Sequence, residues 1–375
     1  MRIVIPLHRP EIGQRELEAV RRVFDSGWLG MGSATREFEE RLREVLGVKH
    51  VVAVNTGTSA LHLAIEALEL QPGDEVLVPS LTFVGSVQAI LAARARPVFC
   101  DVSPETLQID LADALRRVTA RTRAIMPVHY GGAACEMDEL LPAARQRNIR
   151  VVEDAAHAFG SAYKGRKVGT LGDVTCFSFD PVKNITCGEG GAVATDSDDL
   201  ARRVRLKRML GITPDAWSRR DEKQPWFYSV VTPGYRYHLS NLNAAIGLQQ
   251  LQRLEAFKAR KQAIVRAYDD VFRSLSGLKL IVRNGSETCP FLYVVRVLGS
   301  RRDALIAHLR ERGIGTGVHY IPNHLQPLFA ELRVSLPVTE QVFPELLTLP
   351  LYAGMSDADV QTVTAAVQSF FSNSR

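Results

Sequence analysis

The sequence has few cysteines and no long apolar run. Of its 375 residues five are cysteine, an odd number with no close pair, so it predicts neither a disulfide framework nor a zinc site. No stretch approaches the ~18 apolar residues of a membrane span, and residues 1–10 carry charge and prolines instead of an apolar segment. These absences argue against secretion and membrane insertion, and a cytoplasmic location is expected.

The sequence also lacks a common nucleotide-binding motif and clear signals for nucleic-acid binding. No GxxxxGK[ST] loop, which would hold nucleotide phosphates, occurs. The formal net charge is only +5, and the one basic cluster, at residues 202–208, has helical spacing and no interleaved aromatic residues. Such a cluster is more often a solvated helix face, so we expect no nucleic-acid partner. The mild positive excess suits a small anionic substrate.

What the chain does have is the composition of an ordinary folded enzyme. It is 46% hydrophobic and 23% charged, which excludes disorder. A single core stops growing at about 250 to 300 residues, so two domains are expected. We place a large domain at residues 1–245 and a smaller one at residues 246–375.

Short β-rich runs alternate with amphipathic segments from about residue 49 to residue 196. The runs are apolar on both faces, as buried parallel strands require. Helices are predicted at residues 35–46 and after Thr58. The predicted strands lie at residues 51–54, 75–79, 96–101, 124–129, 151–153, 174–179 and 191–195. This alternation indicates an α/β fold with a mainly parallel sheet flanked by helices.

The C-terminal part of the sequence predicts a small α+β domain. One long helix is expected over residues 241–274, leading out of the sheet domain. Ser356 and Asp359 resemble a capping box at the start of the last helix. The other expected elements are a strand at 291–297, a helix at 302–312, a Gly/Pro-rich loop at 313–327 and a last helix at 356–371.

Three segments carry residues suited to chemistry. Residues 55–60 open a helix after a strand, where backbone N–H groups and the Thr58 and Ser59 hydroxyls favour a phosphate, although Ser and Thr are also ordinary caps. Asp154 follows a strand at the carboxyl edge of the sheet, where it can pair with a protonated ring nitrogen or cap a helix. Lys183 lies between an apolar strand and a glycine-rich turn; surface lysines are commoner, but apolar flanks lower a lysine pKa and suit Schiff-base chemistry.

Together these segments meet the needs of pyridoxal 5'-phosphate (PLP). They supply a helix N-terminus for the phosphate, an acid for the pyridine nitrogen and a lysine for the aldehyde. The sequence also resembles the DegT/DnrJ/EryC1/StrS family of sugar aminotransferases. The resemblance runs from Pro6 through the motifs at 26–29, 79–83, 127–129, 153–157 and 349–351. It implies a fold-type I aminotransferase architecture and a homodimer whose active sites are shared between subunits.

The resemblance also implies roles for individual residues. Lys183 would form the Schiff base with the cofactor and move the proton to and from the substrate carbon. Asp154 would keep the pyridinium protonated. Phe83 would stack on the cofactor ring, although an aromatic after a strand is more often a core residue, and His157 would lie near the O3' edge. The residues expected at the phosphate are Gly57, Thr58, Ser59 and Ser178.

One segment departs from the family pattern. The family commonly has an asparagine that reaches the cofactor phosphate of the neighbouring subunit, and this chain has Arg236 there. A guanidinium could make the same contact or bind the diphosphate of the substrate. The chain is similar in this segment, and at residues 184–187 and 313–317, to the member that forms UDP-4-amino-4-deoxyarabinose, which favours 4-amination.

The remaining candidates concern the substrate. No carboxylate or cysteine completes a ligand set with the histidines of residues 318–324, so no metal is expected there. The candidate substrate contacts are Trp28, His319, Tyr320 and His324.

The resemblance implies the transfer of an amino group from L-glutamate to a nucleotide-linked ketosugar by a ping-pong mechanism. The expected acceptor is a 4-keto-6-deoxyhexose or a related sugar, and the product would feed polysaccharide or O-antigen synthesis. A cyclitol or 3-keto sugar is an alternative acceptor, and a non-catalytic PLP-binding regulator is an alternative function. The family's 3-dehydratases have histidine at the anchoring position, so Lys183 argues against that chemistry.

Overall fold

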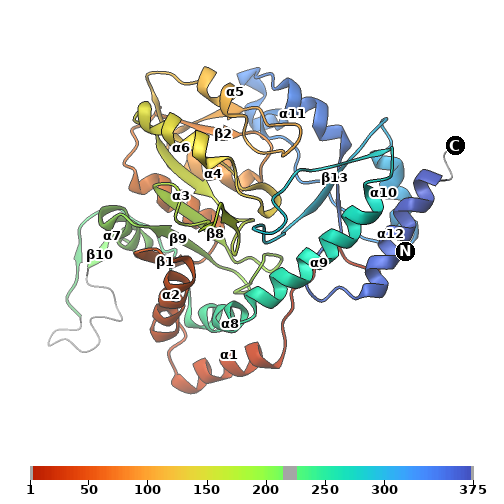
Figure 1. Cartoon of the computed structure of the whole chain (residues 1–375). Helices are drawn as coiled ribbons and strands as arrows, with labels where there is room; N and C mark the ends of the chain where they lie inside the picture. The colour runs from red at the N-terminus through yellow and green to blue at the C-terminus, as the bar shows by residue number, and fades with distance from the viewer. Residues whose placement is uncertain (1–2, 214–225, 373–375) are drawn as a thin grey trace.

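A computed structural model describes residues 3–213 and 226–372 (Figure 1). Its main sheet has the strand order β1-β9-β8-β5-β4-β2-β3. β9 runs antiparallel to both neighbours, and the other paired strands are parallel. The strands are β1 (His50–Val54), β2 (Glu75–Pro79), β3 (Arg96–Cys100), β4 (Thr122–Ile125), β5 (Arg150–Asp154), β8 (Val174–Ser178) and β9 (Gly191–Thr195). All seven predicted strands and the α/β class are confirmed, although β4 ends at Ile125 instead of continuing to His129.

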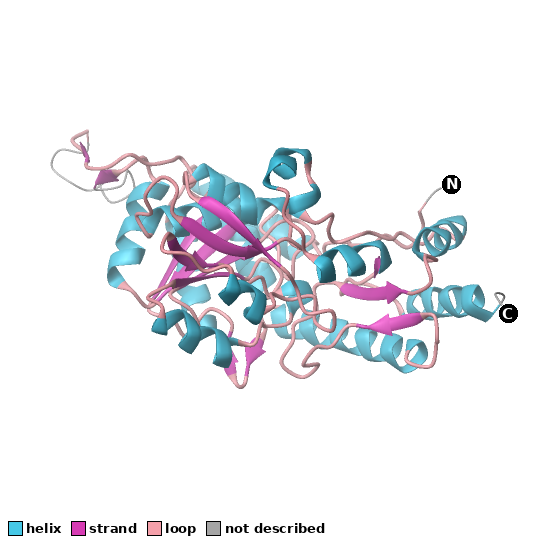
Figure 2. Cartoon of the chain, turned by 90° about the horizontal axis from the view of Figure 1, so that it is seen from above, coloured by secondary structure: helices cyan, strands magenta, loops and turns pink. Residues whose placement is uncertain are grey.

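Helices cover both faces of this sheet, as the view from above shows (Figure 2). One apolar cluster joins the sheet to α3 (Gly57–Ala67), α4 (Val84–Ala92) and α7 (Asp198–Arg208). A second cluster, on the other face, includes α2 (Ser33–Leu46) and α6 (Met137–Gln146). Phe38 and Leu42, one turn apart on α2, are fully buried there, so the predicted helical period faces the core.

A smaller sheet, β12-β13-β14, is antiparallel and packs in a cluster of its own. The predicted C-terminal helices are confirmed. So is the capping box, because Ser356 N donates to Asp359 Oδ2 (3.0 Å) and Asp359 N donates to Ser356 Oγ (3.1 Å). The elements are β12 (Leu278–Leu280), β13 (Tyr293–Val297), β14 (Leu346–Leu349), α9 (Leu254–Phe272), α10 (Arg302–Glu311) and α12 (Asp357–Ser372).

The prediction of one helix over residues 241–274 is wrong, because α8 (Asn241–Leu251) ends before α9 begins. At the break Arg253 N donates to Gln250 O (3.0 Å) in a tighter turn. The break lets α8 pack beside α1 (Gln14–Ser26) and α2 while α9 runs to the small sheet (Figure 1). Neither of the two residues between α8 and α9 is Gly or Pro, so the sequence carries no local signal for a break in the helix.

α9 joins the two apolar cores. Its first turns bury Leu254 and Phe257 in the large core, and its later turns bury Ile264 and Tyr268 in the small one. Ile5, near the N-terminus, also packs in the small core. The division at residues 245 and 246 stays a prediction.

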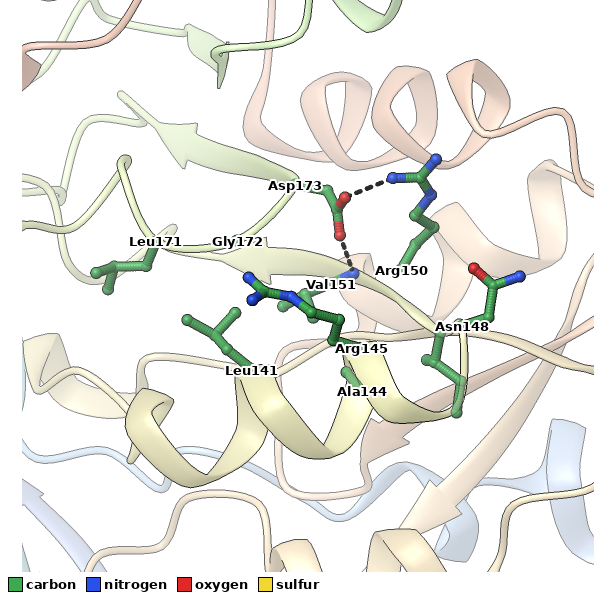
Figure 3. A pocket seen from close by; sticks show the side chains of 10 residues that line it. Leu141, Ala144, Arg145, Asn148, Arg150, Val151, Leu171, Gly172 and Asp173 are labelled. Carbon is green, nitrogen blue, oxygen red and sulfur yellow. Dashed lines mark hydrogen bonds and ion pairs between the residues drawn. The ribbon is translucent and has the colours of Figure 1, made fainter.

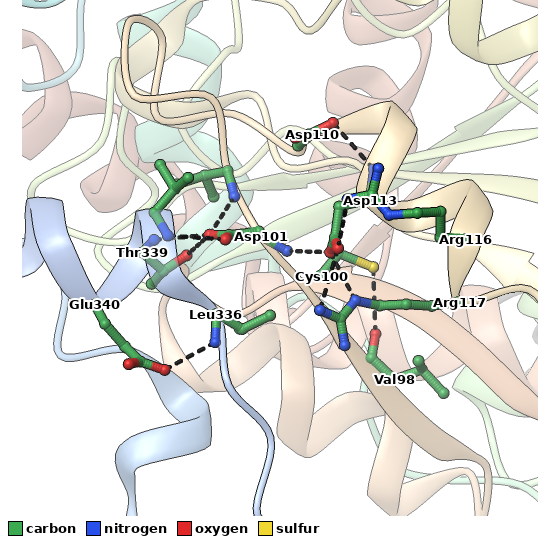
Figure 4. A network of polar contacts seen from close by, with 12 residues as sticks. Val98, Cys100, Asp101, Asp110, Asp113, Arg116, Arg117, Leu336, Thr339 and Glu340 are labelled. Carbon is green, nitrogen blue, oxygen red and sulfur yellow. Dashed lines mark hydrogen bonds and ion pairs between the residues drawn. The ribbon is translucent and has the colours of Figure 1, made fainter.

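A polar network holds the C-terminal half against the main sheet (Figure 4). Asp101, directly after β3, accepts hydrogen bonds from Thr339 N (2.7 Å), Thr339 Oγ1 (2.6 Å) and Val338 N (2.9 Å) of α11 (Pro337–Val342). Its own N–H donates to Asp113 (2.8 Å), which pairs with Arg117. The described residues also form α5 (Leu111–Arg116), β6 (Ala162–Tyr163), β7 (Arg166–Lys167), β10 (Ile212–Thr213) and β11 (Ser229–Val230), and four short 3-10 helices, Tyr130–Gly132, Asn323–Leu325, Pro327–Leu332 and Phe343–Glu345.

Among residues 3–213 and 226–372, no helix is long and apolar enough to cross a membrane. The same ranges hold no group of three or more His, Cys, Asp or Glu side chains placed to bind a metal ion.

Candidate active site

A cavity of about 550 Å3 lies at the carboxyl edge of the main sheet. Parallel strands end at this edge, and ligands of open α/β sheets bind there. Residues that follow β1, β2, β5 and β8 meet a loop of the C-terminal half in its walls. Of the predicted site residues it brings together Gly57, Thr58, Phe83, Asp154, His157, Ser178, Lys183, His319 and Tyr320.

Asp154 ends β5 with a buried, hydrogen-bonded carboxylate. It is 4% exposed, and its Oδ2 accepts a hydrogen bond from Ser86 Oγ (2.6 Å) while Oδ1 accepts one from Ala156 N (3.1 Å). Ser86 in turn contacts Thr82 Oγ1 (2.8 Å). These contacts fix the carboxylate as an acceptor at the floor of the cavity, where it can hold a cationic ring N–H.

The N-terminus of α3 faces the end of β8 at close range. A Cβ added to Gly57 would lie 2.6 Å from the Cβ of Ser178, so only glycine allows this approach. Thr56 caps the helix by accepting from Ser59 N (3.0 Å). The first N–H groups of a helix lack intrahelical partners, and with the hydroxyls of Thr58 and Ser178 they offer donors of the kind that an anion accepts.

Lys183 follows β8 in a turn where its N–H donates to Asp180 O (3.0 Å). Its Nζ lies 4.2 Å from the centre of the Phe291 ring. Burial lowers the pKa of Lys183 to about 8, against the opposing charges of Asp180 and Asp154. The direction agrees with the one expected from its apolar flanks, and the amine has an accessible neutral form near physiological pH.

His157 is held in one tautomer by its neighbours. Gly131 N donates to Nδ1 (3.4 Å), so the ring proton is on Nε2, which donates to Tyr320 Oη (2.9 Å). Burial, with the nearby Lys183, holds the pKa of His157 well below its usual range, and burial raises the pKa of Tyr320. Both groups are therefore neutral hydrogen-bonding groups in the cavity wall.

Phe83 is not a core residue. Its side chain is 54% exposed, and its ring lies 5.7 Å from the ring of Tyr320 across the cavity wall. An exposed aromatic ring beside a cavity is available to pack against a bound ring, as the prediction for Phe83 requires.

Four predicted residues do not line the cavity. Ser59 Oγ contacts Thr56 Oγ1 (2.9 Å) within the cap of α3. Trp28 Nε1 donates to Met31 O (2.9 Å), and Arg236 is exposed beside Met209. His324 is buried, and its Nδ1 contacts Ser80 Oγ (2.7 Å). Their predicted ligand contacts find no support within this one chain.

The sequence reasoning missed several cavity residues. His8 comes from the extended N-terminal segment and stacks on Phe291 at 5.5 Å between ring centres. Burial lowers its pKa to about 4, and its buried Nε2 has no hydrogen-bond partner among the described residues. No local pattern marks His8, whereas Ser86 lies in the first turn of a helix after a strand, a position that often supplies donors to a sheet-edge site.

A second cavity, of about 270 Å3, lies between α6 and the start of β5 (Figure 3). Asp173 there accepts from Arg150 Nη1 (2.7 Å) and Val151 N (2.7 Å). This is the opposite edge of the sheet from Asp154, and none of the predicted site residues lines it.

The first cavity fits the cofactor expected from the sequence. It offers a buried carboxylate, a lysine with a lowered pKa, an exposed aromatic ring and a glycine-dependent helix N-terminus. A carboxylate, an amine and an anion site are the three groups that PLP requires.

Comparison with known proteins agrees with this reading. Residues 10–368 match the model of the DegT/DnrJ/EryC1/StrS aminotransferase family. The chain is 39% identical over 374 residues to the spore coat polysaccharide biosynthesis protein SpsC of Bacillus subtilis, covering 97% of this chain and 96% of SpsC.

Solved structures are similarly close. The aminotransferase TlmJ from Streptoalloteichus hindustanus superposes with a TM-score of 0.93 at 37% identity and 99% coverage of both chains. The putative sugar aminotransferase Spr1654 from Streptococcus pneumoniae, in its PMP form, gives 0.93 at 30% identity, covering 98% of this chain and 99% of that one. The chain therefore belongs to the DegT/DnrJ/EryC1/StrS family of sugar aminotransferases and is a PLP-dependent transaminase.

Proposed function

We propose that the protein transfers the amino group of L-glutamate to a nucleotide-linked ketosugar by a ping-pong mechanism. Glutamate binds first and leaves as 2-oxoglutarate, and the ketosugar then receives the amine. The observation that carries the proposal is the meeting of Lys183, Asp154 and the α3 N-terminus in one cavity of about 550 Å3, a size typical of small-molecule sites.

PLP supplies an aldehyde for amine exchange and a ring that accepts electrons from the substrate carbon. Asp154 would hold the ring nitrogen, and Ser86 fixes that carboxylate. Gly57, Thr58 and Ser178 would hold the phosphate, and Phe83 would cover the ring. Each assignment rests on the placement of that residue in the cavity.

Lys183 would move the proton in each half-reaction. A base must lose and regain a proton near the working pH, and a pKa of about 8 allows its Nζ to do both. His157 and Tyr320 would orient the bound molecules by hydrogen bonds without charge, because both remain neutral. His319, which contacts Thr348 Oγ1 at 2.8 Å, would face the substrate from the C-terminal half.

The residues around Lys183 do not identify the acceptor, so the proposed acceptor is argued from related proteins. SpsC is named for spore coat polysaccharide biosynthesis, and a further structural relative, PseC of Helicobacter pylori (26% identity, TM-score 0.92), for pseudoaminic acid biosynthesis. A sugar acceptor, carried by a nucleotide in the cytoplasm, is consistent with both. Arg236, exposed and outside the cavity of its own chain, would reach the cofactor phosphate or the substrate diphosphate in the other subunit of a homodimer.

The first test is glutamate-dependent amination across a panel of UDP-, dTDP- and GDP-linked ketosugars, with 2-oxoglutarate release measured in parallel. We expect one nucleotide series to be strongly preferred. Release of 2-oxoglutarate without amination of any ketosugar would argue for another acceptor, such as a cyclitol ketone. No release at all would argue for a non-catalytic regulator.

The second test is Lys183→Ala. Loss of the base and anchoring amine should lower turnover by about 10^3-fold or more, and the variant should lack the visible absorbance of the wild-type holoenzyme. Turnover that survived the substitution would overturn the proposed mechanism.

A further inference from the structure

A buried lysine outside the proposed machinery lies close to Lys183. Lys261, on α9, is only 5% exposed, and burial lowers its pKa. Its Nζ donates to Asn184 Oδ1, and it makes no ion pair with a carboxylate among residues 3–213 and 226–372. A buried ammonium with one neutral partner is costly, so its position calls for an explanation.

Asn184, the partner of Lys261, directly follows Lys183. Its Nδ2 donates to Phe159 O (3.0 Å), Cys289 O (3.2 Å) and His157 O (3.4 Å). The amide thus ties the lysine turn to the backbone of a cavity histidine and to the segment that leads to Phe291.

The chemistry of the two side chains fixes which way this amide points. A lysine ammonium has three donors and no acceptor, so it must face the oxygen of Asn184. The amide nitrogen is then directed to the three carbonyl groups. Without the ammonium, Oδ1 would be a buried acceptor with no partner, and the amide would be free to turn.

The same lysine shares a wall with the reacting amine. Lys183 and Lys261 both line a small cavity of about 30 Å3 behind the Phe291 ring. The histidines that share a cavity with Lys183 are neutral at physiological pH, because burial lowers the pKa of each. The other charged and titratable residues described in the walls of these two cavities are Asp154, Asp180, Glu189, Tyr320, Arg9, Glu11 and Tyr352.

We infer that Lys261 is a positioning residue for Lys183: by fixing the Asn184 amide it holds the Lys183 turn against the His157 and Phe291 walls of the active site. The inference rests on the role proposed for Lys183. It places a determinant of the reaction on α9, the helix that joins the two cores.

Lys261→Met keeps the length and bulk of the side chain and removes its donors and charge. In the holoenzyme we expect kcat to fall about tenfold with KM changed less than twofold, because a small misplacement of the reacting group acts mainly on the chemical step. The pH midpoint of the visible absorbance should shift by about 0.5 to 1 unit, because a displaced turn changes the distance of the Lys183 nitrogen from Asp154 and Asp180, whose charges raise its pKa. Lys261→Arg should restore most of the wild-type kcat and most of the wild-type pH midpoint.

The matched control is Lys258→Met, one turn earlier on the same helix. Lys258 Nζ donates to Gly160 O (3.0 Å) and does not contact Asn184. This variant should lose stability without moving the pH midpoint or kcat. If Lys261→Met behaves in the same way, the inference is wrong.

If Lys261→Met does not fold, Asn184→Ala takes its place, and an unchanged midpoint in that variant would equally refute the inference. Where both single variants fold, the double variant of Lys261 and Asn184 should change kcat and the pH midpoint no more than the stronger single variant does, because the two residues act through one contact. These outcomes are separate from the proposed function: an active Lys183→Ala enzyme would overturn the role of Lys183, whereas a silent Lys261→Met would leave that role intact.

Discussion

At the residue scale, the cavity gathers histidines that remain uncharged. Burial lowers the pKa of His8 and His319 to about 4 and that of His157 well below its usual range. Neutral imidazoles add hydrogen-bonding capacity beside Lys183 without adding positive charge. The lysine amine therefore keeps a pKa near neutrality mainly through burial.

These histidines predict an acid-sensitive fold. Unfolding returns each of them to a pKa of about 6.5, so between about pH 6.5 and pH 4 the unfolded chain binds more protons than the folded one. Their contribution to stability is fully present above pH 6.5 and is lost as the pH falls toward 4. His8→Phe, which keeps the stack on Phe291, should show a fall in Tm from pH 7.5 to pH 4.5 that is about 2–4 °C smaller than that of the wild type. Equal falls, measured by thermal unfolding, would contradict the role of His8.

Some site residues could be found from the sequence and others could not. Asp154 and Lys183 each follow a buried strand with a clear apolar pattern, so their place at the sheet edge follows from local signals. His8 reaches the cavity only because the N-terminal segment pairs with a distant one, through the bridge between Ile5 and Ile314. No neighbouring residue encodes that pairing. The position of His324 away from the cavity likewise depends on its long-range contact with Ser80.

At the element scale, the contact between the α3 N-terminus and the end of β8 shapes the proposed phosphate site. Gly57 begins the helix that follows β1, and Ser178 ends β8, two strands that are separated in the sheet by β9. Their approach requires that Gly57 carry no side chain. The local sequence pattern indicated the helix start correctly, whereas only the family resemblance, which placed Ser178 at the same phosphate, indicated that β8 would lie beside it.

Gly57→Ala tests this contact. The new Cβ would lie 2.6 Å from Ser178 Cβ, so the helix start must shift, at a cost of about 1–3 kcal/mol in stability. We expect a lower Tm and faster loss of the cofactor on gel filtration, read from the visible absorbance. Gly285→Ala is the control, because an added Cβ there meets nothing within 4 Å. Cofactor retention equal in the two variants would rule out the close contact.

At the scale of the whole molecule, the C-terminal half is attached to the main sheet at several places. α9 contributes to both cores, and the Asp101 network fixes α11 to the end of β3 (Figure 4). The loop that carries His319 and Tyr320 lies between these attachments. The cavity is therefore assembled from both halves of the chain. Local sequence patterns do not predict this arrangement, and only the family resemblance indicated it.

Asp101→Ala should loosen this assembly. It leaves Thr339 N and Val338 N without their acceptor, and a buried donor that loses its partner costs about 1–3 kcal/mol. We expect a lower Tm and a higher KM for the acceptor, since the C-terminal half carries the loop with His319 and Tyr320 that we propose contacts the substrate. Asp303→Ala, at a carboxylate whose side chain is 81% exposed, should change neither. A normal KM together with a lower Tm would restrict Asp101 to a role in stability.

The reactivity of the buried cysteines reports on unfolding of the part of the molecule that contains them. All five thiols are buried, and they belong to the two clusters that pack against the main sheet and to none of the small-sheet core. Burial raises the pKa of Cys100, Cys176, Cys187 and Cys289, so the intact protein offers little thiolate to an alkylating reagent. The rate of alkylation therefore measures exposure of the large core, and its comparison with loss of helix reveals whether the two cores come apart together or one at a time.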